Sequence, residues 1–152
     1  MKKKALIVSI KGPKLSKNER LLLSKERPWG IILFKRNIVS FNQIKKLVID
    51  IKKLTKDKNF PIMIDEEGST VSRLSSIFNH NTNANYFGDL YAVDKNLAKN
   101  LYISYIHSLC KILNKIGINF NTIPVLDVLR KNTNRIIGKR SFSKNKKIVK
   151  EL

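Results

Sequence analysis

Short apolar runs alternate with longer amphipathic segments along this chain. The apolar runs are typical of buried β-strands, and they occupy residues 5–10 (ALIVSI), 30–34 (GIILF), 61–64 (PIMI) and 118–128 (INFNTIPVLDV). In the last run Pro124 predicts a bend or a strand end, because proline cannot donate a ladder hydrogen bond. Four short strands are therefore expected, with helical segments between them.

The first two amphipathic segments carry clear start signals for helices. Ser16 and Glu19 have the spacing of a capping box, and Ser40 and Gln43 repeat it. From residue 41 to residue 54, apolar residues recur at steps of 3, 3, 1, 3 and 3, with lysines opposite them. That spacing predicts one helix that buries a single stripe.

The second half of the chain is less regular. A long helix is predicted from about residue 97 to residue 116, and Gly117 has the place of the residue that ends it. The apolar spacing at residues 144–152 indicates the start of another helix. Residues 78–96 are rich in asparagine and lack periodicity, so a loop is predicted there.

This alternation indicates an α/β fold with parallel strands and outer helices. An open doubly wound sheet would normally have a glycine-rich phosphate turn after its first strand, and residues 9–13 (SIKGP) do not form one. Part of a (β/α)₈ barrel explains better why polar residues follow the strands, at 35–37, at 65–67 and at Asp127. Barrel enzymes place their chemistry at these strand ends.

Composition favours a folded protein in a reducing compartment. The chain has 152 residues, of which 42% are hydrophobic, enough for one ordinary core. Cys110 is the single cysteine, and two histidines cannot supply zinc-site spacing, so neither a disulfide nor a structural metal is expected. The apolar run 5–10 is too short for a signal peptide and no run could span a membrane, so we expect a soluble cytoplasmic protein.

The net charge of +20 raises the possibility of nucleic-acid binding. The excess comes from 24 lysines against 7 arginines, beside 16 asparagines, which is the composition that AT-rich codons give throughout a proteome. The lysines occur in scattered pairs, and no RNA-recognition or zinc-finger signature accompanies them. Background composition is the preferred interpretation, and a basic nucleic-acid-binding protein stays an alternative.

Four motifs together resemble glycoside hydrolase family 3, in particular its bacterial β-N-acetylglucosaminidases of muropeptide recycling. Residues 29–37 (WGIILFKRN) are similar to the family's GxILFxRN segment, and residues 64–74 (IDEEGSTVSRL) to DQEGGRVxRL. Residues 116–128 are similar to GINxNxAPVLDV, and residues 137–142 (IGKRSF) to IGxRSF. The motifs occur in the family's order and spacing, and they imply the N-terminal part of a (β/α)₈ barrel.

The resemblance implies that Asp65, Arg73 and Arg140 bind the sugar at the non-reducing end of the substrate. Carboxylate and guanidinium groups suit this task, because they form charge-assisted hydrogen bonds to hydroxyl groups. Without the resemblance, Asp65 would be interpreted as a helix N-cap and Arg73 as the ion-pair partner of Glu66 or Glu67. No cofactor and no metal are implied.

Other polar residues are expected to support the site or the fold. Asp127 is expected to hold Arg140 or backbone amides in place, and Glu67 to lie behind the sugar-binding groups. The other residues of interest are given structural interpretations: Cys110 as a core residue, His107 as a helix-surface residue, His80 as a loop residue outside any motif, and Trp29 as a packing residue at the barrel end.

The sequence also departs from the family. Glu66 stands where glutamine is usual, Ser69 and Thr70 replace Gly-Arg, and Lys139 replaces a common glutamate. The KHFPGHG and DSH motifs, which carry the family's acid/base pair, do not occur in these 152 residues, and neither does the nucleophile. No catalytic residue is therefore assigned, and a complete barrel would need about 250 residues.

The leading hypothesis is that residues 1–152 form the first half of a family 3 domain, whose full form is a retaining exo-β-N-acetylglucosaminidase acting on cell-wall fragments. The chain alone is expected to be inactive. An alternative is a split enzyme that works only with a separately encoded C-terminal half. The expected partners are a carbohydrate substrate and possibly that second half, without a specific nucleic acid or a membrane.

Overall fold

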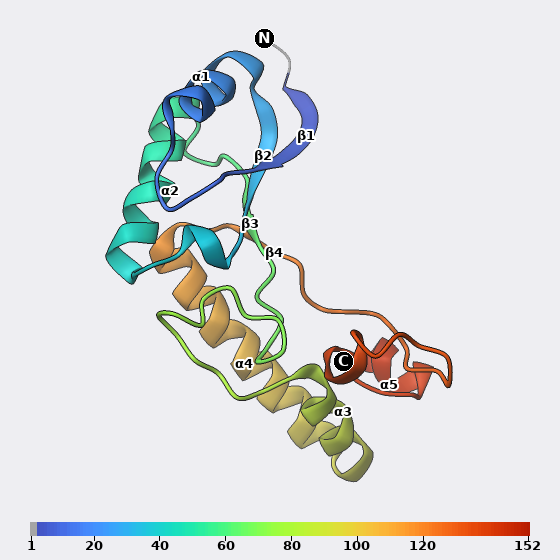
Figure 1. The fold of residues 1–152 in the computed structure, drawn as a ribbon. Helices are drawn as coiled ribbons and strands as arrows, with labels where there is room; N and C mark the ends of the chain where they lie inside the picture. Colours follow the sequence, from blue (N-terminus) through green and yellow to red (C-terminus); the bar gives the residue numbers. More distant parts are fainter. Residues whose placement is uncertain (1–2) are drawn as a thin grey trace. The chain divides into compact units, whose positions relative to one another are not determined.

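The computed structural model describes residues 3–152 and contains one parallel sheet (Figure 1). Its strands are β1 (Lys4–Ser9), β2 (Pro28–Leu33), β3 (Ile62–Ile64) and β4 (Phe120–Asn121), in the spatial order β1-β2-β3-β4. All three neighbouring pairs are parallel. The predicted α/β class with parallel strands is therefore confirmed.

The chain divides into two compact units. Unit 1 contains the described residues up to Asp65, together with Arg73–Asn79 and Ile112–Asn121, and it includes the whole sheet. Unit 2 contains Glu66–Ser72, His80–Lys111 and Thr122–Leu152. Each unit is described below by itself.

Unit 1 has two helices that start where the sequence predicts. Helix α1 (Lys17–Glu26) begins with a complete capping box: Glu19 N donates to Ser16 Oγ at 3.3 Å, and Ser16 N donates to Glu19 Oε2 at 2.7 Å. Helix α2 (Phe41–Thr55) begins with Gln43 N donating to Oγ of Ser40. The Gln43 side chain accepts from Val39 N, one residue before the expected position.

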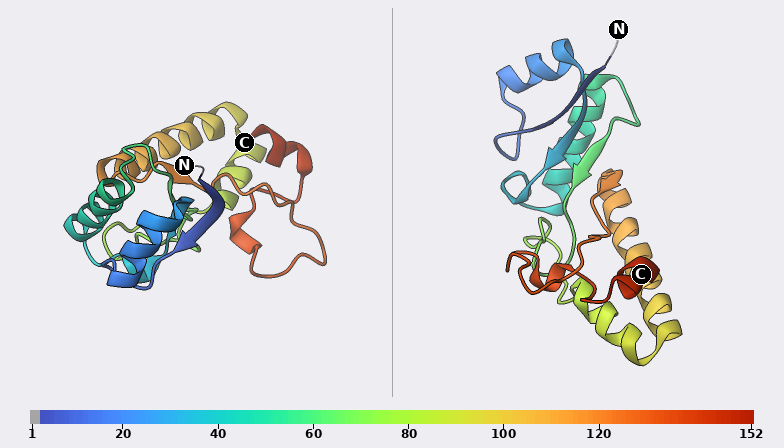
Figure 2. Two further views of the ribbon diagram at one scale, coloured as in Figure 1. Left: turned by 90° about the horizontal axis from the view of Figure 1, so that it is seen from above. Right: turned by 90° about the vertical axis from the view of Figure 1, so that its right-hand side faces the viewer.

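The core of unit 1 lies between the sheet and the helices. Helices α1 and α2 lie on the same face of the sheet, as Figures 1 and 2 show. This is expected for right-handed connections between strands whose order in the sheet is their order in the sequence. The core includes Ile31, Leu33, Ile62 and Ile64 of the sheet and Ile44, Leu47, Val48 and Ile51 of α2, which are each at most 4% exposed. Burying each such side chain contributes about 1.5–3 kcal/mol.

Two strand predictions need correction. Strand β1 was expected to be buried, but Leu6 and Ile7 are 54% and 45% exposed, because β1 is an edge strand that pairs with β2 alone among the described strands. Strand β4 covers Phe120–Asn121 instead of residues 118–128. The Ile123–Pro124 peptide, which is cis, lies beyond this strand.

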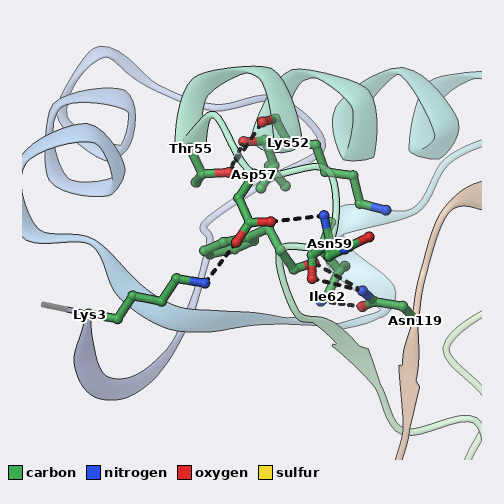
Figure 3. Close-up of polar contacts among 9 residues, drawn as sticks. Lys3, Lys52, Thr55, Asp57, Asn59, Ile62 and Asn119 are labelled. Atoms are coloured by element: carbon green, nitrogen blue, oxygen red, sulfur yellow. Dashed lines mark hydrogen bonds and ion pairs between the residues drawn. The ribbon is translucent and has the colours of Figure 1, made fainter. Parts of the chain in front are cut away.

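A group of polar contacts fixes the N-terminal ends of β3 and β4 (Figure 3). Ile62 N donates to Asn119 Oδ1 at 2.8 Å, and Asn119 Nδ2 donates to the carbonyl oxygen of Asn59 at 3.3 Å. Asp57 accepts from Asn59 N and forms an ion pair with Lys3 at 2.7 Å. Asn119 thus has a structural role at the end of the sheet opposite the polar strand ends.

Unit 2 is built around aromatic side chains. It contains α3 (Ala84–Val93), most of α4 (Lys95–Ile116), a 3-10 turn η2 (Gly138–Arg140) and α5 (Lys146–Glu151). Its core cluster consists of Phe87, Phe142 and Val149, with Tyr102 and Tyr105 packed against it. Helix α4 ends at Ile116, and Gly117 follows it with a φ of 98°, as the sequence predicts. No helix in residues 3–152 has the length and apolar content to cross a membrane.

The loop prediction for residues 78–96 is wrong for its second part, where α3 forms. Phe87 and Tyr91 are both buried, and Gly88 approaches the backbone of Phe142 so closely that a Cβ atom there would lie 1.7 Å from the Phe142 carbonyl oxygen. Tertiary contacts therefore stabilise a helix that its local pattern does not specify.

Candidate functional site

The segment after β2 is fixed to the end of β1 by a buried asparagine. Asn37 is 0% exposed; its Oδ1 accepts from Phe34 N at 2.8 Å, and its Nδ2 donates to the carbonyl oxygens of Ile10 and Gly12, both at 3.0 Å. Arg36 Nε also donates to the Ile10 carbonyl oxygen, at 3.1 Å. The RN pair of the first motif thus holds together the C-terminal ends of two neighbouring strands.

Asp65 and Arg73 meet within unit 1. Asp65 directly follows β3, and Arg73 Nη2 lies 3.4 Å from Asp65 Oδ2. The Arg73 guanidinium also lies 5.7 Å from the centre of the Phe34 ring, within the range of a cation–π contact. Both side chains are partly exposed, Arg73 at 30% and Asp65 at 21%. Residues 66–83 contain no helix, so Asp65 is not a helix N-cap.

Arg140 and Glu67 form a second ion pair, within unit 2. Arg140 Nε donates to Glu67 Oε2 at 2.7 Å, and Arg140 Nη2 donates to Glu67 Oε1 at 2.9 Å. The Glu67 side chain is 9% exposed and that of Arg140 21%. This bidentate geometry fixes the plane of the guanidinium group, so Glu67 determines the orientation of Arg140.

The segment that carries Glu67 is a tight loop, residues 66–72. The amides of Glu67 and Gly68 both point to the carbonyl oxygen of Val71, at 2.9 and 3.4 Å. Gly68 has a φ of 153°, and a Cβ atom on it would lie 2.6 Å from the Thr82 carbonyl oxygen. A larger residue would therefore push this loop away from the segment before α3.

Asp127 lies at the end of the third motif. Its side chain is exposed, and the hydrogen bond that it contributes comes from its backbone carbonyl oxygen, which accepts from Ser141 Oγ. Arg140, which precedes Ser141 in the sequence, has Glu67 as its bidentate partner. The sequence pointed to Asp127 because it ends a motif, but the strand that was expected to lead to it ends at Asn121.

A buried polar chain in unit 2 was missed by sequence reasoning. Ser72 Oγ donates to Glu66 Oε1 at 2.6 Å, and His80 Nε2 lies 2.8 Å from the same oxygen. His80 Nδ1 lies 3.0 Å from the hydroxyl oxygen of Tyr105 on α4. His80 lies in a loop, as predicted, but its ring is buried and contacts Glu66 of the second motif, which the sequence did not indicate. The unusual glutamate at 66, together with one of only two histidines, was the available signal.

Tyr102 and Tyr105 keep their phenolic protons at neutral pH. Burial raises the pKa of Tyr105 to about 12, and the nearby charge of Glu66 adds to the effect. Burial also raises the pKa of Tyr102 to about 12. A protonated phenol can donate a hydrogen bond to a ring nitrogen of His80, whose Nδ1 lies 3.0 Å from the Tyr105 hydroxyl oxygen.

Other sequence expectations have mixed outcomes. Cys110 was interpreted as a core residue, and this is wrong, because its place on α4 faces solvent. His107 is exposed on the same helix, as predicted. Trp29 is 37% exposed and packs edge-to-face on Phe120, with ring centres 5.5 Å apart.

The two residues that depart from the family's Gly-Arg have a shared partner. Asn83 Nδ2 donates to Ser69 Oγ at 2.6 Å, while the backbone amide and hydroxyl of Thr70 donate to Asn83 Oδ1 at 2.9 and 2.8 Å. These polar side chains therefore fasten the tip of loop 66–72 to the start of α3. In residues 3–152, no three His, Cys, Asp or Glu side chains lie close enough to share a metal ion.

Comparisons with known proteins point in one direction. The profile of the glycosyl hydrolase family 3 N terminal domain matches residues 2–152. A beta-hexosaminidase of Thioalkalivibrio sulfidiphilus is 31% identical over 149 residues, which are 97% of this chain and 42% of that protein. A beta-hexosaminidase of Xanthomonas campestris is 30% identical over 144 residues, 95% of this chain and 43% of that protein.

Solved structures agree with these relatives. The crystal structure of native NagZ from Neisseria gonorrhoeae superposes with a TM-score of 0.90 at 29% identity, covering 98% of this chain and 43% of that one. The same enzyme in complex with N-trifluoroacetyl-D-glucosamine gives a TM-score of 0.87 at 28% identity, covering 98% of this chain and 44% of that one. The chain thus spans less than half the length of the relatives that it matches.

Proposed function

Because this chain belongs to glycosyl hydrolase family 3, whose N terminal domain profile covers residues 2–152, we propose that it forms part of a β-N-acetylhexosaminidase. The substrate would be a glycan with a terminal N-acetylglucosamine. The observation that carries the proposal is the partly exposed Asp65–Arg73 ion pair directly after β3. Two relatives named beta-hexosaminidase, and a related structure in complex with an N-acylated glucosamine, support the choice of sugar.

The proposed roles follow from the chemistry of the three groups. The carboxylate of Asp65 accepts hydrogen bonds from sugar hydroxyl groups, and the guanidinium groups of Arg73 and Arg140 donate to sugar oxygens. Each arginine already has a carboxylate partner in its own unit, Asp65 for Arg73 and Glu67 for Arg140. These partners set the direction of the remaining N–H groups before the sugar arrives, which lowers the entropy cost of binding.

Glycoside hydrolysis with retention needs a nucleophile and an acid/base group as well as a sugar-binding site. The family motifs that supply these two groups are not among residues 1–152. We therefore assign the chain a binding role and expect the reaction to require residues outside it. Asp127, which is exposed, has no assigned part in the reaction.

The proposal includes a further segment, in the same polypeptide or in a separate one, that completes the barrel. Among the described strands, β1 and β4 each pair on one side only, which leaves two open strand edges. Leu6, Ile7 and Phe120 on these strands are 44–54% exposed (54%, 45% and 44%). Exposed apolar edge strands favour association with further strands, which supports a partner of this kind.

We further propose cell-wall fragments in the cytoplasm as the setting of the reaction. The relatives from Neisseria gonorrhoeae and Thioalkalivibrio sulfidiphilus carry the names NagZ and beta-hexosaminidase. The exposed thiol of Cys110, the single cysteine, suits a reducing compartment.

The first test measures binding of N-acetylglucosamine to the 152-residue chain by NMR titration. The wild type should bind, and Asp65→Asn should weaken binding by about tenfold or more, because a charged acceptor is lost. Asp50→Asn is the matched control, since Asp50 is an exposed carboxylate of unit 1 that pairs with Arg20. Equal affinities for Asp65→Asn and Asp50→Asn would contradict the assignment.

The second test measures hydrolysis of a chromogenic N-acetylglucosaminide. The chain alone should release no chromophore above the solvent background. Co-expression with the part of the T. sulfidiphilus beta-hexosaminidase that this chain does not match should produce release, and Asp65→Asn should abolish it. Steady release by the chain alone would refute the division of roles, and an active Asp65→Asn complex would refute the role of Asp65.

A further inference from the structure

The buried pair of Glu66 and His80 has no part in the sugar-binding roles given above. The Glu66 side chain is 0% exposed and that of His80 is 6% exposed. Burying a carboxylate is costly unless hydrogen bonds compensate for the lost water. Here Glu66 Oε1 receives two of them, from Ser72 Oγ at 2.6 Å and from His80 Nε2 at 2.8 Å.

The positions of the protons along the series Glu66, His80 and Tyr105 follow from the groups at its two ends, a carboxylate and a phenol. A carboxylate only accepts, so His80 presents its proton on Nε2 toward Glu66. The Nδ1 atom is then an acceptor for the hydroxyl of Tyr105, whose pKa burial raises to about 12. Both ring nitrogens have partners within the protein and the ring is buried, so we assign His80 no contact with the substrate. Its role must lie in holding other residues.

Glu66 and Ser72 are the first and last residues of loop 66–72, and their side chains join its two ends. Glu67, next to Glu66, is the bidentate partner of Arg140. Backbone hydrogen bonds within the loop are few: the amides of Glu67 and Gly68 share the Val71 carbonyl oxygen. Asn83 and the Thr82 carbonyl oxygen hold the tip of the loop, and the buried contacts of Glu66 and Ser72 hold the end that carries Glu67.

We propose that Glu66 and His80 are positioning residues for Arg140. The buried chain Ser72–Glu66–His80–Tyr105 anchors loop 66–72 to α4, and Glu67 in that loop holds the Arg140 guanidinium in the orientation that binds sugar. This inference rests on the proposed function only in its last step, the binding of sugar by Arg140. The holding of Arg140 by the loop is independent of any sugar.

The experiment compares His80→Leu with His107→Leu in the 152-residue chain. His107 is the other histidine and is exposed on α4, so its substitution controls for the loss of an imidazole. Solvent exchange of the Arg140 Nε–H, which donates to Glu67 at 2.7 Å, is followed by NMR. His80→Leu should accelerate this exchange by about tenfold or more, as expected when a hydrogen bond to a charged group is lost. His107→Leu should leave it unchanged.

A conservative variant separates positioning from general stability. Glu66→Gln keeps an acceptor oxygen for Ser72 and His80, so it should retain slow exchange at Arg140, whereas Glu66→Met should lose it. If His80→Leu does not fold, Tyr105→Phe replaces it, because this variant removes only the hydroxyl group at His80 Nδ1. Tyr105→Phe should accelerate the exchange by roughly threefold.

Sugar affinity provides the second arm. In folded His80→Leu protein the affinity for N-acetylglucosamine should fall by about tenfold, in parallel with the Arg140 exchange rate. Unchanged exchange at Arg140 in both His80→Leu and Glu66→Met, or in Tyr105→Phe, would overturn the positioning role. If the wild type fails to bind the sugar, the proposed function fails, while the exchange rates still decide whether His80 and Glu66 hold Arg140.

Discussion

Glu67→Gln tests whether the bidentate contact with Arg140 stabilises unit 2. The substitution keeps the side-chain volume and one acceptor oxygen, but it removes the charge and turns an NH₂ group toward the guanidinium group. One of the two hydrogen bonds, at 2.7 and 2.9 Å, must be lost. Breaking a fully buried ion pair on one side costs about 3–5 kcal/mol.

The expected cost is smaller than that limit because solvent reaches one partner. The Glu67 side chain is 9% exposed, but Arg140 keeps 21% of its side chain in water and can recover part of its solvation. We therefore expect Glu67→Gln to lower the free energy of unfolding by about 2–3 kcal/mol. Glu151→Gln is the matched control in the same unit, since the Lys99–Glu151 pair is 41% and 47% exposed and should contribute little.

The chain offers separate spectroscopic probes for its two units. Tyr86, Tyr91, Tyr102 and Tyr105 are its four tyrosines and all belong to unit 2, while Trp29 is the single tryptophan and belongs to unit 1. Urea unfolding of unit 2 is monitored by the near-ultraviolet circular dichroism of the tyrosines, and unfolding of unit 1 by the fluorescence of Trp29. The tyrosine signal should show the lower free energy of unfolding of Glu67→Gln. A Glu67→Gln transition that coincides with those of the wild type and Glu151→Gln would refute the reasoning.

Three further outcomes are expected from single features of the structure. Gly88→Ala should lower the free energy of unfolding by at least about 3 kcal/mol, because a Cβ atom there would lie 1.7 Å from the Phe142 carbonyl oxygen; wild-type stability in urea would contradict this. Gly12→Ala should change it by no more than about 0.5 kcal/mol, since a Cβ atom there meets nothing within 4 Å, and a larger loss would show a contact that the structure lacks. Burial opposes ionisation of Glu19, but hydrogen bonds from two backbone amides and the Ser16 hydroxyl outweigh it and lower its pKa below 4.5. Its contribution is therefore present above about pH 4.5 and lost as the pH falls through the lowered pKa, so the difference in urea midpoint between wild type and Glu19→Gln should shrink on acidification; a constant difference would disprove the linkage.

Local signals in the sequence were sufficient for the first half of the fold. The capping pair Ser16 and Glu19 and the apolar stripe of α2 act between residues three or four apart, so a single helix already contains all the partners involved. The parallel order of the strands followed from their alternation with helices. Asp65 and Arg73 were singled out by a motif, and the structure brings them into contact.

The remaining features depended on partners distant in the chain. Helix α3 has a weak local pattern and forms where Phe87 and Gly88 pack on residues around Phe142, more than fifty positions away. His80 is positioned by its contacts with Glu66 and with Tyr105 on α4. No spacing rule connects such residues, because their contacts exist only once the helices have packed.

The sequence by itself determined the α/β class, the positions of the first helices and the family motifs, since each depends on short-range periodicity or on a contiguous string of residues. The tertiary structure alone decided which carboxylate serves which arginine: Asp65 holds Arg73, and Glu67 holds Arg140. It also decided that Glu66 is buried and in contact with His80. The physical reason is that Asp65, Glu66 and Glu67 are adjacent in sequence and all carry a carboxyl group. Only the path of the backbone through loop 66–72 places these groups in different environments.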